Sequence, residues 1–85
     1  MEYHIDCAEL QTRAELHNAL AQLPCFPQWY GRNLDALYDV LTDIAEETQL
    51  HFHHWEATAD FSRGFYRTFL DAQEKNPCLQ VYFHS

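Results

Sequence analysis

The sequence predicts an α/β fold in which a three-stranded parallel sheet packs against about three to four helices. Strand-like and helical segments alternate in the order strand, helix, helix, strand, helix, strand, and capping residues or prolines mark the helix ends. Strands joined by helical crossovers run parallel to one another. At 85 residues the chain can bury one modest core. We therefore expect a single domain over residues 1–85.

The first strand and the first helix are marked by local patterns. Residues 3–7 alternate apolar and polar side chains, which is typical of a short strand. Thr12 and Glu15 have the spacing of a capping box, which opens a helix. Apolar residues then recur at helical spacing from Leu16 to Leu23. Pro24 ends this helix, because proline lacks the N–H that a helix interior needs.

A loop and a second helix follow. Two prolines and one glycine indicate that residues 24–32 form the loop. Asn33 is a good N-cap for the next helix, since its side-chain oxygen can accept a hydrogen bond from a free backbone N–H. The apolar stripe of that helix consists of Leu34, Leu37, Leu41 and Ile44.

The C-terminal half contains two further strands and one helix. Residues 50–55 are expected to form the second strand, and residues 79–83 the third. Between them, Phe61, Phe65 and Phe69 recur at helical spacing and are expected to face the core. The Asn76-Pro77 pair terminates this helix.

The charge balance narrows the range of partners. Five Lys and Arg against 13 Asp and Glu give a net charge of −8. Binding to a phosphate backbone needs clustered cations, so we expect no nucleic-acid partner. No apolar run approaches the roughly 20 residues that span a bilayer, and acids among the first ten residues are unlike a signal peptide. We therefore expect no membrane partner, and the charge favours a basic protein.

The three cysteines indicate a reducing compartment. Cys7, Cys25 and Cys78 are odd in number and form no C-x-x-C pair, whereas small secreted domains usually carry an even disulfide framework. We expect small, free core residues in a cytoplasmic protein. A catalytic thiol would need nearby cations, and the chain has few.

An acidic row is predicted on the second helix. Between Asn33 and Ser62 there are seven acidic residues and no Lys or Arg. Asp35, Asp39 and Asp43 fall four residues apart on one face, where like charges destabilise a helix by about 0.2–0.5 kcal/mol per pair. A row that lowers stability favours a functional explanation. An ordinary solvated face of an acidic protein is the alternative.

Two large aromatic residues precede this helix. Trp29 and Tyr30 lie in the loop beside Gly31. Such side chains supply rigid contact area at protein interfaces, although one or both could instead plug the core beneath the loop. A carboxylate row flanked by loop aromatics suits a cationic pocket built to hold phosphates.

The segment PQWYGRNLDALYDVLT, residues 27–42, carries a resemblance. Its core, Y-G-x-N-L-D-A-L-x-D, resembles the signature of the barstar family of intracellular inhibitors of barnase-type ribonucleases, and the resemblance covers essentially the whole chain. It implies a small parallel sheet with helices, and inhibition rather than catalysis. In that family the second helix and the loop before it fill the ribonuclease active site, where a carboxylate takes the place of the substrate phosphate.

The resemblance also implies which residues bind the partner. Asp39 matches the dominant phosphate-mimicking acid and Asp35 a second carboxylate. Trp29 stands where the family has an interface tyrosine, and Arg32 where it has a glutamate. The expected partner-binding set is Trp29, Tyr30, Gly31, Asn33, Asp35, Tyr38, Asp39, Thr42, Asp43 and Asp71. The expected partner is a basic secreted ribonuclease or related toxin, bound by a chain that is monomeric when free and needs no cofactor.

A metal site is one alternative interpretation. His51 and His53 project to the same face of the predicted second strand, with His54 beside them and His84 near the third. Two imidazoles on a strand can bind zinc, but no third ligand is evident from the sequence. We therefore expect satisfied or surface histidines, with no metal ligands. A pH-sensing role is the remaining option.

Two further alternatives concern function. Asp35 and Asp39 could act as a general acid and base, or could bind Mg²⁺ together with Asp43. Such chemistry needs a pocket, and a single helix face supplies none, so we expect no enzyme activity. The other alternative is an acidic immunity or interaction module whose partner is a non-ribonuclease toxin or another basic protein.

Overall fold

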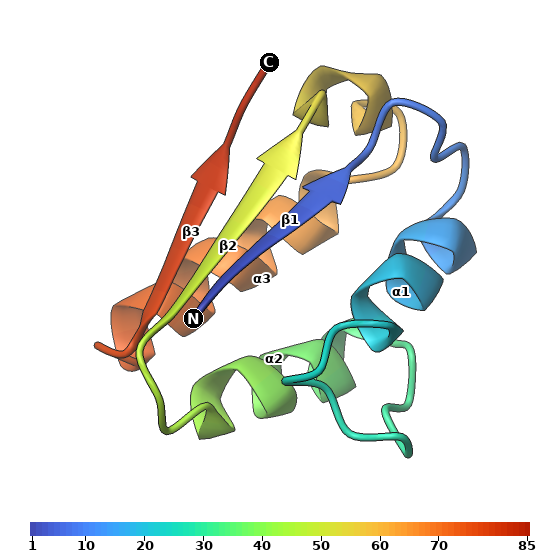
Figure 1. Ribbon diagram of the computed structural model, residues 1–85. Coiled ribbons are helices and arrows are strands. Elements are labelled where there is room, and N and C mark those ends of the chain that lie inside the picture. The colour runs from blue at the N-terminus through green and yellow to red at the C-terminus, as the bar shows by residue number, and fades with distance from the viewer.

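The computed structural model describes residues 1–85 and contains the predicted α/β architecture (Figure 1). The elements in chain order are β1 (Glu2–Asp6), α1 (Arg13–Ala21), α2 (Leu34–Asp43), β2 (Thr48–His53), the short 3-10 helix η1 (Trp55–Thr58), α3 (Arg63–Lys75) and β3 (Leu79–Phe83). The strands form one sheet in the order β1-β2-β3, and both pairs are parallel. The predicted three-stranded parallel sheet is confirmed. No helix combines the length and hydrophobicity needed to cross a membrane.

The two faces of the sheet differ in character. On the inner face, Leu50 and Phe52 of the central strand β2 are buried, and their register partners continue the apolar surface. Figure 1 shows α3 passing behind the sheet and no helix in front of it. The outer face carries polar side chains from alternate positions of all three strands. The core therefore lies between the inner face and the helices.

Both predicted helix caps are confirmed. The hydroxyl oxygen of Thr12 accepts a hydrogen bond from the backbone N–H of Glu15 at 3.1 Å. The Glu15 carboxylate accepts in return from the N–H of Gln11, one residue before the position that a capping box would use. At the second helix, Oδ1 of Asn33 accepts from the N–H of Ala36 at 2.8 Å. Local spacing alone thus sets where α1 and α2 begin.

The predicted bounds of the second strand were wrong. The strand begins at Thr48 and ends at His53, because His54 adopts a left-handed φ of 58° that turns the chain into η1. Trp55 then packs its ring against Phe52 and Phe83, with ring centroids 5.3 and 4.8 Å away. Trp55, which the sequence pattern placed in the strand, therefore reaches the core from the short helix η1.

The core contains the expected aromatic residues of α3. Phe65 and Phe69 are fully buried, and Phe69 lies 4.8 Å from Phe52 between ring centroids. Phe61 precedes the helix and is half-buried. All three cysteines are free, as expected: Cys7 is buried, and Cys25 and Cys78 are half-buried.

Asn76 connects the end of α3 to the end of α2. Its buried side-chain amide donates to the carbonyl oxygens of Leu41 and Ile44, each at 2.9 Å. Its Oδ1 accepts from the N–H of Cys78 at 2.9 Å. Carbonyls in the last turn of a helix have no intrahelical partner. Asn76 therefore supplies partners for the C-terminal end of α2, which carries the acidic row.

Candidate partner-binding site

The acidic row lies on the solvent side of α2. Asp35, Asp39 and Asp43 come from successive turns, and all three are exposed. The opposite side of the helix buries Leu37, Val40 and Leu41 in the core. Because these apolar anchors fix how the helix packs on α3 and the core, the carboxylates are held outward and about one turn apart.

The charge of this row has no counterpart within the chain. The three ion pairs of the structure all join histidines to Glu2 or Asp6 on the sheet. None involves α2, and α2 contains no lysine or arginine. An exposed row without internal cations is available to the cations of another molecule.

Arg32, the cation nearest in sequence, is directed toward α1. Its Nε donates to Oδ1 of Asn18 at 2.9 Å, and its Nη1 donates to the carbonyl of Tyr30 at 3.5 Å. The residue has a left-handed φ of 54°, an unusual conformation for a side chain of this size. The guanidinium thus ties the loop to α1 and does not neutralise the acidic row.

The two loop aromatics have different surroundings. Trp29 is 80% exposed, whereas Tyr30 is only 2% exposed. The Tyr30 ring meets Phe26 edge-on, and its hydroxyl oxygen lies 2.6 Å from Nδ1 of the buried His17. Tyr30 is therefore the aromatic that plugs the core beneath the loop, and Trp29 is the one that is open to a partner. No local sequence pattern indicates this role of His17, because a histidine thirteen residues upstream carries no signal of the contact.

A small hollow joins the loop to the C-terminal half of α2. It has a volume of about 150 Å³ and a mainly apolar wall. Trp29 lines it from the loop, and Asp43 lines it from the helix. The remaining lining residues are Cys25, Pro27, Val40 and Ile44. The fold thus brings one predicted aromatic contact and one predicted acid to the same depression.

The other predicted residues of this region lie around the row. Gly31 is exposed, and a Cβ added there would lie 3.4 Å from that of Ala36, an ordinary contact. Tyr38 is half-buried against the core. The Thr42 hydroxyl donates to the carbonyl of Tyr38 at 2.9 Å, so its hydrogen is used within the helix. The side-chain oxygen of Asn33 is likewise engaged in the helix cap.

Asp71 occupies a different part of the surface. It is exposed on α3 and lines a broad hollow of about 750 Å³ together with Arg63, Arg67 and Glu74. No residue of α2 lines this hollow. Neither Asp35 nor Asp39 lines any of the four hollows in the surface. Acid–base catalysis generally uses carboxylates inside a pocket, and these two lie on an open helix face.

The histidines of the metal alternative are not isolated. Nδ1 of His51 lies 2.9 Å from Nε2 of His84, and Nε2 of His53 lies 2.7 Å from Nδ1 of His4. These rings gather on the outer face of the sheet, and Glu2 joins them. No local pattern in the sequence places His4 and Glu2 in this group, since their proximity to His51 depends on the pairing of β1 with β2.

Comparison with known proteins agrees with the local motif and the fold. The model of the family Barstar (barnase inhibitor) matches residues 1–77. A search among curated proteins found no match. The matched segment includes the loop, α2, β2 and α3. Members of this family are inhibitors and not enzymes, and they bind barnase-like ribonucleases. The chain belongs to the barstar (barnase inhibitor) family.

Proposed function

We propose that this chain inhibits a basic ribonuclease by filling its active site with α2 and the loop before it, with Asp39 in the place of a substrate phosphate. The observation that carries the proposal is the exposed row of Asp35, Asp39 and Asp43, whose charges have no cation within the chain. In the active site of a ribonuclease, the cations that hold an RNA phosphate would supply the charge complementary to this row. Membership of the barnase-inhibitor family supports this kind of partner.

The rigidity of the acidic row favours tight binding. Its carboxylates sit on a helix whose inner face is buried and whose last turn is held by Asn76. Binding therefore costs little ordering of the backbone, and more of the interaction energy appears as affinity. Positively charged surroundings would also draw the row in before contact.

The loop supplies the second part of the proposed interface. Trp29 offers a flat, exposed ring with an indole N–H, and the exposed Gly31 lies two residues further along the loop. We assign partner contact to these two, to the three acids and to the exposed edge of Tyr38. Tyr30, Asn33 and Thr42 hold the loop and helix in place, because their polar groups are engaged inside the chain. Asp71 would reach the partner from α3.

The proposed place of action is the cytoplasm, where the host's own RNA needs protection. Three free cysteines without a disulfide fit a reducing compartment. One chain would block one ribonuclease, so we expect the free inhibitor to be monomeric.

An RNA-cleavage assay tests the proposal. Barnase, and each small basic ribonuclease secreted by the same host, is mixed with the purified chain at equimolar concentration. We expect cleavage by at least one of them to stop. Replacing Asp39 with Ala should weaken binding by about 2–5 kcal/mol, a range to which the prototype barnase–barstar complex itself contributes. Asp60→Ala, an exposed acid outside α2, is the matched control and should inhibit like the parent chain.

Three results would contradict this function. Undiminished RNA cleavage by every ribonuclease in the presence of excess chain would remove the ribonuclease as partner. If a basic toxin of another catalytic class were bound through the same row, the chain would instead be an immunity module for that toxin. Equal losses for Asp39→Ala and Asp60→Ala would show that net charge matters and not the acidic row.

A further inference from the structure

Histidine side chains gather on the outer face of the sheet, and none of them belongs to α2, which carries the acidic row. Parallel sheets are usually covered on both faces, but Figure 1 shows this face without a helix in front of it. Four of the six histidines of the chain have their rings there, in contact with one another: His4, His51, His53 and His84. The family role proposed above does not use this cluster.

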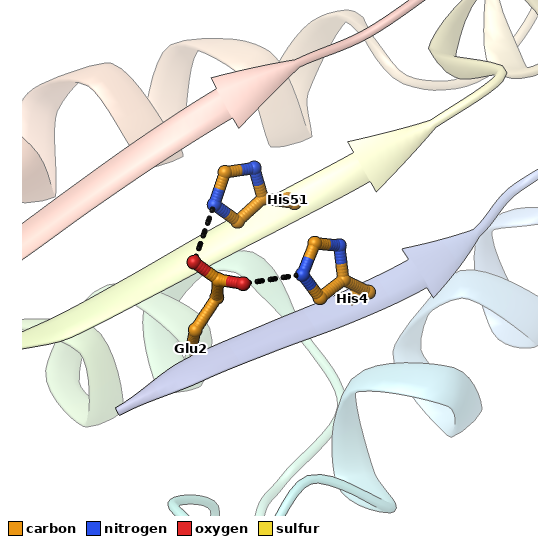
Figure 2. A group of neighbouring side chains, drawn as sticks. All are labelled: Glu2, His4 and His51. Carbon is orange, nitrogen blue, oxygen red and sulfur yellow. Dashed lines mark hydrogen bonds and ion pairs between the residues drawn. The ribbon is translucent and has the colours of Figure 1, made fainter.

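Glu2 lies between two of these imidazoles (Figure 2). Its Oε2 is 2.9 Å from Nε2 of His4, and its Oε1 is 3.7 Å from Nε2 of His51. The sheet produces this arrangement, because Glu2 and His4 are two residues apart on β1 and His4 is the register partner of His51 on β2. Three ligand-type atoms therefore converge from two neighbouring strands.

The separations suit a small metal ion. One ligand atom from each of the three side chains lies within 4.8 Å of the others. In four-coordinate zinc with bonds of about 2.1 Å, ligand atoms are about 3.4 Å apart, so the three atoms need to approach by about 1.4 Å at most. Side-chain rotation is enough for a change of this size, since the Glu2 and His4 side chains are about half exposed.

The other ring nitrogens have the partners that metal ligands require. A histidine that binds metal through Nε2 carries its proton on Nδ1, and that N–H normally donates to a neighbouring acceptor. Nδ1 of His4 lies 2.7 Å from Nε2 of His53, and Nδ1 of His51 lies 2.9 Å from Nε2 of His84. Each Nε2 can accept with its lone pair. His53 and His84 thus orient the rings of His4 and His51 through their Nδ1 atoms, independently of Glu2.

Stacking holds the rings in the same arrangement. The ring centroids of His4 and His51 are 4.6 Å apart, with planes 14° from parallel. On the other side of His51, the Tyr82 ring is stacked at 4.7 Å. A site whose ligands are already oriented loses less freedom when the ion binds.

The donor set selects the class of ion. Two imidazole nitrogens and one carboxylate suit first-row transition metals, whereas Ca²⁺ and Mg²⁺ prefer oxygen ligands. The position faces solvent, so water would complete the coordination. We propose that Glu2, His4 and His51 bind a divalent transition-metal ion, with Zn²⁺ as the reference ion, on the outer face of the sheet. His53 and His84 are positioning residues for the two ligand histidines.

Isothermal titration of the untagged, chelator-treated chain with ZnCl2 tests this site. We expect one ion per chain, and a melting temperature that rises by about 10 °C at a hundredfold excess over the dissociation constant. Co²⁺ in place of Zn²⁺ should give the visible absorption of nitrogen and oxygen ligation. Ca²⁺ should give neither heat nor stabilisation.

Variants identify the ligands. His4→Gln, His51→Gln and Glu2→Gln should each weaken Zn²⁺ binding at least tenfold. His53→Gln and His84→Gln should weaken it by about 10–100-fold without changing the stoichiometry. His54→Gln is the matched control, because that ring lies by the Asp6 carboxylate at the end of the strand. All five ligand and positioning side chains are on the outer face, so circular dichroism should show each variant folded.

Three results would overturn the proposal. The first is a failure of Zn²⁺ to bind or to raise the melting temperature of the parent chain. The second is a loss of affinity in His54→Gln as large as that in His4→Gln, which would indicate dispersed surface binding. The third is the loss of binding in a Cys25→Ser, Cys78→Ser variant that keeps all its histidines, which would move the ion to the thiols.

Discussion

The hydroxyl oxygen of Tyr30 lies 2.6 Å from Nδ1 of His17, and this buried contact joins the loop before α2 to α1. A single hydrogen bond joins the two groups: the phenol O–H donates to Nδ1 in one neutral tautomer of the imidazole, and the Nδ1–H donates to the phenol oxygen in the other. The ring of His17 is held on its other side by Phe65, with centroids 4.6 Å apart. The start of the proposed inhibitory helix is therefore anchored through a polar pair in the core, and not by apolar contacts alone.

Removing the Tyr30 hydroxyl should destabilise the fold. Tyr30→Phe leaves Nδ1 of His17 buried without a partner, which costs about 1–3 kcal/mol of unfolding free energy. Urea denaturation followed by circular dichroism measures the change. Tyr66→Phe, at an exposed tyrosine of α3, is the control and should stay within about 0.5 kcal/mol of the parent chain. Equal effects of the two substitutions would mean that the His17 contact adds nothing.

Stability should fall as the pH drops below the ordinary histidine range. Burial lowers the pKa of His17, with a smaller contribution from the charge of Arg32. Near pH 6.5 the unfolded chain therefore takes up a proton at His17, whereas the folded chain does not. The stabilisation from the neutral, buried ring is complete above pH 6.5, and it is lost as the pH falls from there toward the lower pKa of the folded chain. Desolvation also lowers the pKa of His53 and acts in the same direction.

Urea midpoints between pH 7.5 and 5 measure this dependence. The slope with pH should flatten in His17→Gln and in His53→Gln, because each variant lacks one of the two groups. A parent chain whose midpoint rises on acidification over this interval would contradict the assignment. Hydrogen bonds with the His4 ring and from the backbone N–H of Ala8 lower the pKa values of Glu2 and Asp6, so these two carboxyl groups titrate below this range.

Local signals predicted the parts of the fold that depend on neighbouring residues. Thr12 and Asn33 cap helices through atoms three residues away, so their roles follow from spacing alone. The exposure of the acidic row follows in the same way, because Leu37 and Leu41 determine which side of α2 is buried. The number and order of the strands also follow from short alternating or apolar runs, although the bounds of the second strand do not.

Long-range contacts determined what the sequence did not predict. Trp29 and Tyr30 are adjacent aromatics, and the ring that is buried is the one that contacts His17 on α1 and Phe26. The end of β2 depends on the turn at His54, whose ring pairs with Asp6 from another strand. The grouping of Glu2 with His51 depends on strand register, which no local pattern specifies.

Salt should slow association with the ribonuclease. The acidic row is exposed and has no internal counter-charge, so attraction to a basic active site acts through solvent. The screening length falls from about 10 Å at 0.1 M to about 3 Å at 1 M ionic strength. Stopped-flow mixing should show an association rate that drops at least tenfold over this range, with a much smaller change in dissociation. A flat association rate would argue against steering by the row.

Cys7 should be the least reactive of the three thiols. Its side chain is fully buried, and burial raises its pKa to about 11, so almost no thiolate exists at neutral pH. Alkylation with iodoacetamide under native conditions, followed by peptide mass spectrometry, should modify Cys78 first and Cys7 only after unfolding. Labelling in urea is the control, in which all three sites should react. Native labelling of Cys7 at the rate of Cys78 would contradict the buried position.

Asn76 offers the sharpest test of how the acidic helix is held. Its amide N–H groups donate to the carbonyls of Leu41 and Ile44 at the C-terminal end of α2. Asn76→Ala removes these bonds inside a buried site, and we expect a loss of about 2–3 kcal/mol of unfolding free energy. Asn76→Asp should cost more, because a carboxylate replaces donors with acceptors and adds negative charge at the negative end of the helix dipole.

The order of the two variants distinguishes hydrogen bonding from packing. Aspartate is closer than alanine to the size of asparagine, so a role in packing alone would make Asn76→Asp the milder change. Urea denaturation at pH 7 gives the order directly. Because Asn76 holds the last turn of α2, both variants should also weaken ribonuclease binding when measured below their melting temperatures. Stability lost without any change in binding would mean that the acidic row keeps its geometry without this contact.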